Sequence, residues 1–196
     1  RRCRNREGVK ALEAALWVGY RPAQEAAWDA LVGIGKVPVR NELLALKAII
    51  DGEWGKALEF GVDAVKPLLT TLRHEDNYRA EQALELLERI DELPVIPGLV
   101  AALDEVGPGI RYDIARILGD SVHPQAFETL VRLLADENST VRCSAATALG
   151  AQGDEHAVPH LRPLLDDDEV GVAEHARSAL EKLKWQPSTD AEKIAW

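Results

Sequence analysis

The chain has 196 residues, of which 46% are hydrophobic and 29% charged, a composition typical of a globular protein with a sizeable core. A formal net charge of −10 argues against a nucleic-acid partner, because phosphate binding needs a cationic face. No apolar run approaches the roughly 18 residues of a membrane span. The two cysteines, Cys3 and Cys143, are far apart, which excludes a disulfide framework. We therefore expect a cytoplasmic protein that binds neither nucleic acid nor membrane.

The N-terminal part predicts two helix pairs, a regular one at 6–35 and an atypical one, interrupted by glycines, at 38–61. Within the first pair, Leu16 and Leu31 keep the separation that Leu134 and Leu149 have in a later repeat. Trp28 lies beside the apolar stripe of its helix, which leaves two interpretations. It either packs in the core or anchors a partner in a groove.

A period of about 31 residues governs most of the remaining chain, and a period of this length is typical of helical repeat proteins. Leu130 recurs as Leu161, and Ala148 recurs as Ala179. Such repeats stack so that neighbouring units bury one common core. The period predicts four further helix pairs, at 62–93, 94–124, 125–155 and 156–185.

The internal pattern of a repeat is clearest around its two apolar stripes. Apolar residues at i, i+3 and i+4 from Leu130 predict a first helix, and those at i, i+4, i+7 and i+8 from Val141 predict a second. The polar stretch 136–139 between them supplies capping side chains for the second helix. Gly150 and Gly153 are expected to end that helix.

A family resemblance follows from one segment, VRCSAATALGAQGDEHAVPHLRPLLDD at 141–167. Its pattern V-R-x-x-A-A-x-A-L-G, then G-D, then A-V-x-x-L-x-x-L-L-x-D resembles the HEAT-like repeat of phycobilisome lyases. The resemblance implies an all-α fold, a right-handed α-solenoid (α-α superhelix) of stacked antiparallel helix pairs forming one domain over 1–196. It implies no single function, because unrelated proteins use this repeat. Residues 186–196 look like the start of a further block, and with no initial Met we interpret the chain as a fragment of a longer array.

Two arginines stand at the same position of successive repeats. Arg111 and Arg142 are one period apart, and Asp136 and Asp167 lie in the turns between helices with the same spacing. A ladder of such charges either binds a ligand or fixes how repeats stack. We interpret it as an inter-repeat Asp–Arg network that sets the register of stacking.

Histidines are the only candidate metal ligands, and their pattern argues against a site. His156 and His160 stand at i and i+4, which predicts one shared helix face, but only His123 of the previous repeat offers a third ligand. Among HEAT-like enzymes, deoxyhypusine hydroxylase holds two irons through His-Glu pairs at the starts of second helices. The matching positions here are Tyr112-Asp113, Cys143-Ser144 and Glu174-His175. None of these is a His-Glu pair, and His74-Glu75 has the right order but falls in an expected turn. We therefore expect no such enzyme, no metal or other cofactor and no catalytic residue, and an inert Cys143.

Helical phase places one strip of side chains on the second helices, away from the core. This strip carries more acids than bases and predicts a concave groove for a protein or peptide of basic character. The candidate groove residues are Glu81, Glu85, Tyr112, Asp113, Arg116, Ser144, Thr147, Glu174 and His175.

The leading hypothesis from the sequence is a non-enzymatic interaction scaffold. Two alternatives stay open: a bilin lyase or chromophore chaperone, which the resemblance suggests, and a structural fragment of a longer HEAT-like array. A HEAT-like DNA glycosylase is disfavoured because the expected groove is acidic.

Overall fold

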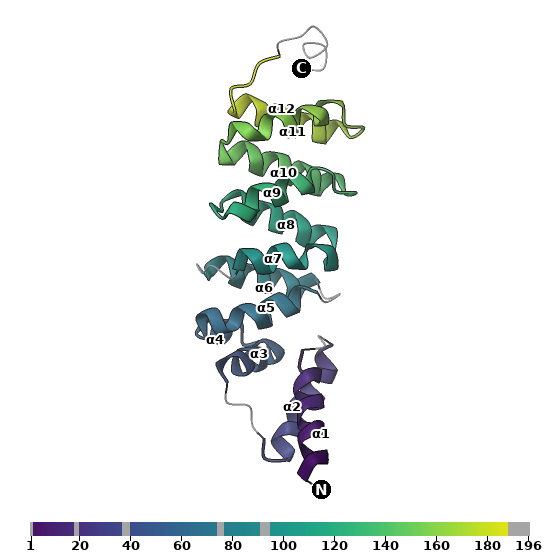
Figure 1. Cartoon of the computed structure of the whole chain (residues 1–196), viewed down its shortest axis with the longest axis vertical. Coiled ribbons are helices and arrows are strands. Elements are labelled where there is room, and N and C mark those ends of the chain that lie inside the picture. Colours follow the sequence, from purple (N-terminus) through teal and green to yellow (C-terminus); the bar gives the residue numbers. More distant parts are fainter. Residues whose placement is uncertain (1, 18–19, 37–39, 74–76, 91–94, 188–196) are drawn as a thin grey trace. The chain divides into compact units, whose positions relative to one another are not determined.

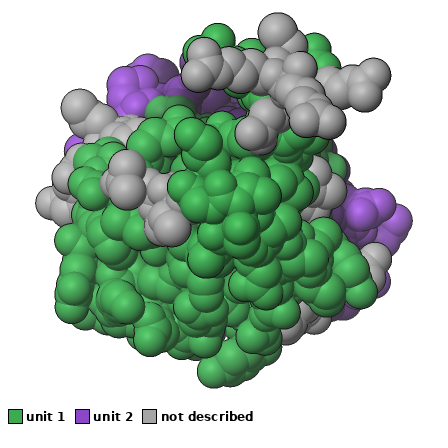
Figure 2. Space-filling model, turned by 90° about the horizontal axis from the view of Figure 1, so that it is seen from below, with its two compact units in different colours: residues 1–98, 104–106 green, residues 99–103, 107–196 purple. Residues whose placement is uncertain are grey.

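The computed structural model describes residues 2–17, 20–36, 40–73, 77–90 and 95–187, and in these ranges it consists of helices and turns without strands. The chain divides into two compact units, 1–98 with 104–106 and 99–103 with 107–196, each described here by itself (Figure 2). Most of the predicted block at 186–196 lies outside the described residues. No helix among the described residues is long and apolar enough to cross a membrane.

Unit 1 is built from short and medium-length helices (Figure 1). They are α1 (Arg2–Ala15), α2 (Arg21–Gly33), α3 (Asn41–Asp51), α4 (Trp54–Leu58), the 3-10 turn η1 (Gly61–Ala64), α5 (Val65–Leu72) and α6 (Asn77–Arg89). Helix α7 (Val95–Ala102) and the 3-10 turn η2 (Leu103–Glu105) contribute residues to both units.

Trp28 belongs to the core of unit 1. Its side chain is only 7% exposed and packs in a cluster with Leu16, Leu31 and Leu43. The ammonium of Lys47 lies 5.8 Å from the centre of its ring. The interpretation of Trp28 as a groove anchor is therefore wrong, because the ring is occupied by packing between α2 and its neighbours.

Unit 2 repeats one plan, a broken or short first helix followed by a long second helix. Its elements are α8 (Pro108–Gly119), α9 (Pro124–Leu133), α10 (Ser139–Gln152), η3 (Glu155–Ala157), α11 (Val158–Leu161), η4 (Arg162–Asp166) and α12 (Val170–Lys182). The first helix of the last repeat is divided into η3, α11 and η4. Pro159 and Pro163 lie at these starts, where the missing backbone N–H of proline is tolerated.

Glycines let the second helices approach closely. Helix α10 is capped by Asn138, whose side chain accepts from the Thr140 N–H at 3.0 Å, and ends at Gly153 in the left-handed region with φ 71°. It thus runs through Gly150, and the expectation that Gly150 ends the helix is wrong. A Cβ at Gly150 would lie 2.7 Å from the Cα of Ala179 on α12, so this glycine is required by packing.

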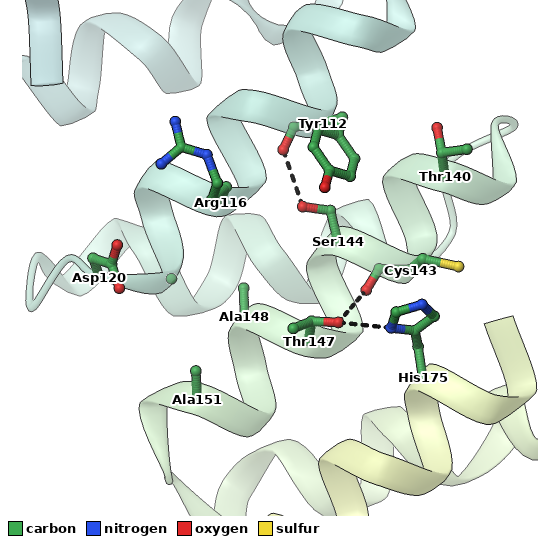
Figure 3. A pocket seen from close by; sticks show the side chains of 11 residues that line it. Tyr112, Arg116, Asp120, Thr140, Cys143, Ser144, Thr147, Ala148, Ala151 and His175 are labelled. Atoms are coloured by element: carbon green, nitrogen blue, oxygen red, sulfur yellow. Dashed lines mark hydrogen bonds between the residues drawn. The ribbon is translucent and has the colours of Figure 1, made fainter. Parts of the chain in front are cut away.

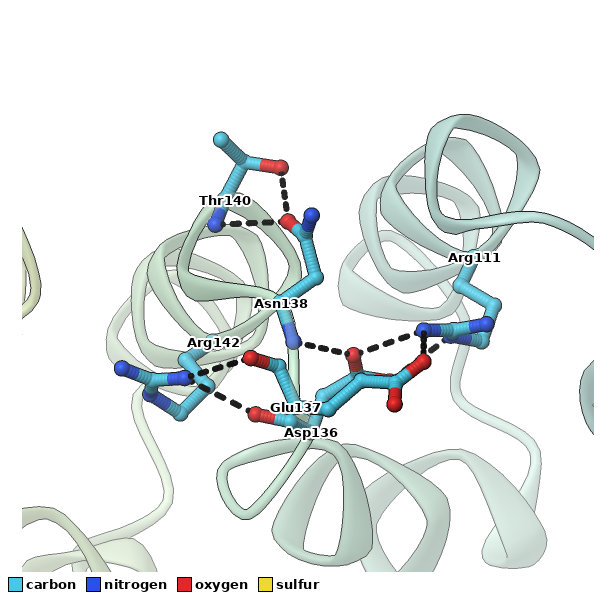
Figure 4. A network of polar contacts seen from close by, with 6 residues as sticks. All are labelled: Arg111, Asp136, Glu137, Asn138, Thr140 and Arg142. Atoms are coloured by element: carbon cyan, nitrogen blue, oxygen red, sulfur yellow. Dashed lines mark hydrogen bonds and ion pairs between the residues drawn. The ribbon is translucent and has the colours of Figure 1, made fainter.

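The predicted Asp–Arg network is confirmed, and it links successive repeats (Figure 4). Arg111 donates from Nε and Nη2 to the Asp136 carboxylate at 2.8 and 2.9 Å. Arg142 donates to Asp167 at 2.9 and 2.8 Å. Arg142 also donates to the backbone carbonyl of Asp136 at 2.9 Å, which joins the two pairs.

The carboxylates of this network stay ionised. Hydrogen bonds from Arg142 hold the pKa of Asp167 below its usual value against the opposing effect of burial. Burial is the largest influence on Asp136 and raises its pKa, but the bonds from Arg111 and from the Asn138 N–H together bring the pKa below its usual value. The charges therefore hold the turns of one repeat against the helix of the previous one.

Candidate functional site

Three consecutive second helices of unit 2, α8, α10 and α12, surround a pocket of about 510 Å³ (Figure 3). Because stacked repeats present the same helical face side by side, residues one repeat apart in the chain are neighbours at the pocket. The lining residues are Tyr112, Arg116, Gly119, Asp120, Thr140, Cys143, Ser144, Thr147, Ala148, Ala151 and His175.

Helix α8 supplies the aromatic and charged side chains of the pocket. Tyr112 is 42% exposed, so much of its ring is available to a ligand. Arg116, one turn further along, lies 3.9 Å from the Asp113 carboxylate, between its Nε and the Asp113 Oδ1. Asp120 follows at the C-terminal end of the helix, so the α8 wall presents both signs of charge.

Helices α10 and α12 supply hydroxyl, thiol and imidazole groups. The Ser144 hydroxyl donates to the Tyr112 carbonyl at 3.0 Å and ties α10 to α8. The Thr147 hydroxyl donates to the Cys143 carbonyl at 2.9 Å and lies 2.9 Å from Nδ1 of His175 on α12. These groups stand beside the apolar Ala148 and Ala151, and none of the residues by which α10 and α12 line the pocket is a carboxylate.

The structure brings five of the nine predicted groove residues together at this pocket. These five are Tyr112, Arg116, Ser144, Thr147 and His175. Ser144 differs from the expectation that it points away from the core, because it is buried and its hydroxyl is used between helices.

The other four predicted residues are elsewhere. Asp113 and Glu174 lie on α8 and α12 but do not line the pocket. Glu81 and Glu85 lie on α6 in unit 1.

Sequence reasoning missed several lining residues, among them Asp120, Thr140 and Ala151. Asp120 and Ala151 stand at i+4 from Arg116 and Thr147, one helical turn along the same face. Extending the predicted strip by one turn in each repeat would have found them.

The thiol of Cys143 is the one cysteine side chain among the residues that line the pocket. Burial raises the pKa of the Cys143 thiol, which disfavours the nucleophilic thiolate. No group of three or more His, Cys, Asp or Glu side chains within the described ranges is placed to hold a metal ion. His74-Glu75, which has the order of the iron-binding pairs, lies outside the described residues.

The remaining histidines have local roles. His156 lies in η3 and His160 in α11, so the expected single helix carrying both is wrong. Nδ1 of His156 lies 2.7 Å from the Asp154 carboxylate, and His123 caps α9 by accepting from the Gln125 N–H at 3.2 Å.

Comparison with known proteins identifies the repeat type. Residues 96–181 match the family model of HEAT repeats, so the HEAT-repeat part of the resemblance is confirmed. A solved structure of human deoxyhypusine hydroxylase in complex with glycerol has a TM-score of 0.50 and 17% identity, covering 91% of this chain and 96% of that one. At that identity the similarity shows the fold alone.

Curated relatives carry the same enzyme name. The deoxyhypusine hydroxylase of Neurospora crassa is 36% identical over 134 residues, which are 65% of this chain and 41% of the relative. That of Drosophila melanogaster is 31% identical over 109 residues, 55% of this chain and 36% of the relative. The chain thus spans well under two thirds of the length of the relatives it matches.

These relatives correct three expectations. They are enzymes, so the predictions of a non-enzymatic interaction scaffold and of a chain that is not an enzyme are contradicted. They are deoxyhypusine hydroxylases, so the phycobilisome-lyase subtype and a bilin lyase function are not supported. The expectation of no such enzyme, which rested on the lack of His-Glu pairs at the matching second-helix positions, is likewise contradicted by the names of these relatives.

Proposed function

We propose that the HEAT repeats of unit 2 bind a segment of a protein substrate in the α8–α10–α12 pocket, and that this recognition serves an enzyme related to the deoxyhypusine hydroxylases. One observation carries the proposal: three successive second helices converge on one pocket of about 510 Å³ lined by an exposed tyrosine and several hydrogen-bonding side chains. Pockets with an apolar wall and a few placed polar groups are typical ligand sites.

The charge around the pocket favours a basic segment. Asp113 and Glu174 stand on the two flanking helices, and Asp120 lines the pocket. These three acids outnumber the one arginine of the lining, Arg116, and the chain carries a formal net charge of −10. Opposite charges on the substrate would speed its approach and orient it. The Tyr112 ring offers a face on which an ammonium or guanidinium group stacks favourably.

The relatives suggest the first substrate to test. Because they are named as deoxyhypusine hydroxylases, a peptide that contains deoxyhypusine is the natural probe. We expect it to bind more tightly than the same peptide with alanine in that place. Equal affinities in isothermal titration calorimetry would contradict this choice of substrate and leave the pocket itself to be tested by other peptides.

A selection experiment tests the pocket without assuming the ligand. A phage library of short random peptides is selected on the immobilised chain and then on the variant Tyr112→Ala. We expect basic peptides that bind the wild type and lose about tenfold in affinity on the variant, since aromatic anchors commonly contribute about 1–3 kcal/mol or more.

The matched control removes a different exposed tyrosine. Tyr20, which is 67% exposed before α2 in unit 1, is changed to alanine and should leave the selected peptides bound. Peptides that bind all three proteins equally, or no enriched peptide at all, would refute the proposed function.

The finer architecture is part of the same proposal. We infer a repeat of about 31 residues, because the Gly–Ala contacts and the Asp–Arg pairs recur at this spacing. The right-handed superhelix is proposed from the resemblance to HEAT repeats. A cytoplasmic location fits the two widely separated cysteines.

A further inference from the structure

The Thr147–His175 pair determines which nitrogen of the imidazole carries a proton. A threonine hydroxyl has one proton to donate, and Thr147 donates it to the Cys143 carbonyl at 2.9 Å. Towards Nδ1 of His175, also at 2.9 Å, Thr147 can therefore only accept. The hydrogen of the neutral ring must then sit on Nδ1, which leaves Nε2 as an acceptor.

The second ring nitrogen of His175 is not the one that contacts Thr147. His175 is exposed and lines the pocket. In Figure 3 its second nitrogen lies on the ring edge turned toward Cys143, away from the bond to Thr147. A nitrogen without hydrogen attracts a group that brings its own proton.

We propose that Thr147 is a positioning residue that fixes the Nδ1–H tautomer of His175, so that Nε2 accepts a hydrogen bond from an amine or guanidinium N–H of the bound segment. The assignment of the ligand rests on the proposed function, whereas the assignment of the tautomer rests on the hydrogen-bond geometry alone. The acidic Asp120 and the exposed Tyr112 ring in the same pocket favour this cationic donor over a hydroxyl.

Nuclear magnetic resonance reads the tautomer directly. Protein labelled with ¹⁵N-histidine is recorded at about pH 8. The His175 signal is assigned by its loss in His175→Gln. We expect protonated Nδ1 in the wild type and in Thr147→Ser, which keeps the hydroxyl, and a shift toward protonated Nε2 in the isosteric Thr147→Val. Protonated Nε2 in the wild type, or no change in Thr147→Val, would overturn the inference.

Binding of the peptides selected on the wild type gives the second readout. Thr147→Val and His175→Gln should weaken a lysine-containing peptide about tenfold, the effect of losing one hydrogen bond to a charged group, while Thr147→Ser retains affinity. A changed tautomer with unchanged affinity would overturn the role in recognition. If the wild type binds no peptide but shows protonated Nδ1, the proposed function fails and the tautomer assignment stands.

Discussion

At the scale of single residues, two ion pairs show that burial determines how much a pair of opposite charges stabilises the fold. Arg142 makes a bidentate contact with the Asp167 carboxylate and donates a third hydrogen bond to a backbone carbonyl. The side chains of Arg142 and Asp167 are 15% and 13% exposed. Arg21 and Glu25 form a pair of similar length at 2.7 Å, but these side chains are 51% and 46% exposed. Water screens the second pair far more than the first.

Removing the arginine of each pair should therefore lower the free energy of unfolding by different amounts. We expect Arg142→Ala to lower the free energy of unfolding by about 2 kcal/mol, because it leaves a partly buried carboxylate and a carbonyl without their donor. Arg21→Ala should cost no more than about 0.5 kcal/mol. Urea unfolding followed by circular dichroism measures both, and equal losses would contradict the argument.

The lowered pKa values of Asp136 and Asp167 predict acid sensitivity with a definite sign. A carboxyl whose pKa is lower in the folded state stabilises the protein above its unfolded pKa of about 3.9, and this stabilisation is lost as the pH falls through the folded value. Unfolding free energies should thus fall below about pH 5. In the double variant Asp136→Asn and Asp167→Asn the fall should be shallower, and an identical pH profile would disprove the role of these groups.

At the scale of elements, the second helices pack through glycine and alanine. Gly119 on α8 faces Ala148 on α10, where an added Cβ would lie 2.9 Å from the alanine Cβ. Gly150 on α10 faces Ala179 on α12 in the same way. This repeated contact sets the distance between neighbouring second helices, and hence the width of the pocket that α8, α10 and α12 line.

Gly150→Ala should be destabilising even though alanine favours helices. The new methyl would meet the Ala179 Cα at 2.7 Å, and since that atom belongs to the backbone the helices must separate. We expect a loss of about 1–3 kcal/mol in unfolding free energy. The control Gly171→Ala in α12 meets nothing within 4 Å and should be neutral or stabilising by up to about 1 kcal/mol. A stable Gly150→Ala protein would show that the helices can yield at little cost.

Parts of these elements were predictable from the sequence, for a physical reason. The helix pairs follow from apolar spacing, and the Asn138 cap and the arginine pairs follow from residue type and the repeat period. Gly150 was misread because local rules associate glycine with helix ends, and only the approach of a neighbouring helix reveals its packing role. The sequence left the role of Trp28 undecided for the same reason, since the burial of its side chain depends on residues of α3.

The site was predictable only in part. Helical phase identified Tyr112, Arg116, Thr147 and His175 as outward-facing, because the apolar periodicity within one helix is enough to show which side chains face away from the core. It gave an acidic groove, whereas the pocket is lined by one acidic residue, Asp120, and one arginine, Arg116. Which residues meet across helices, and the hydrogen bond between Thr147 and His175, depend on stacking that no single window of sequence contains.

At the scale of the whole molecule, stability should be graded along the repeats. Each repeat of a solenoid is held by its neighbours, so a helix packed on both sides opens less readily than one packed on one side. Within unit 2, α10 packs against both α8 and α12, and seven of its residues are buried.

Hydrogen exchange measures this gradient. We expect peptides from α10 to exchange more slowly than peptides from α12, which has four buried residues in the described part of the chain. Mass spectrometry after exposure to deuterated buffer gives the protection of each helix. Faster exchange in α10 than in α12 would mean that stability is not distributed by nearest-neighbour packing.

The central claim is that the α8–α10–α12 pocket is where a basic segment of a protein substrate binds. The most direct measurement is an NMR titration of the ¹⁵N-labelled chain with the tightest peptide from the selection. We predict shifted amide signals at 112–120, at 140–151 and around His175, with unchanged signals in α2. Shifts that gather in unit 1, or that spread without reaching the residues lining the pocket, would contradict the claim.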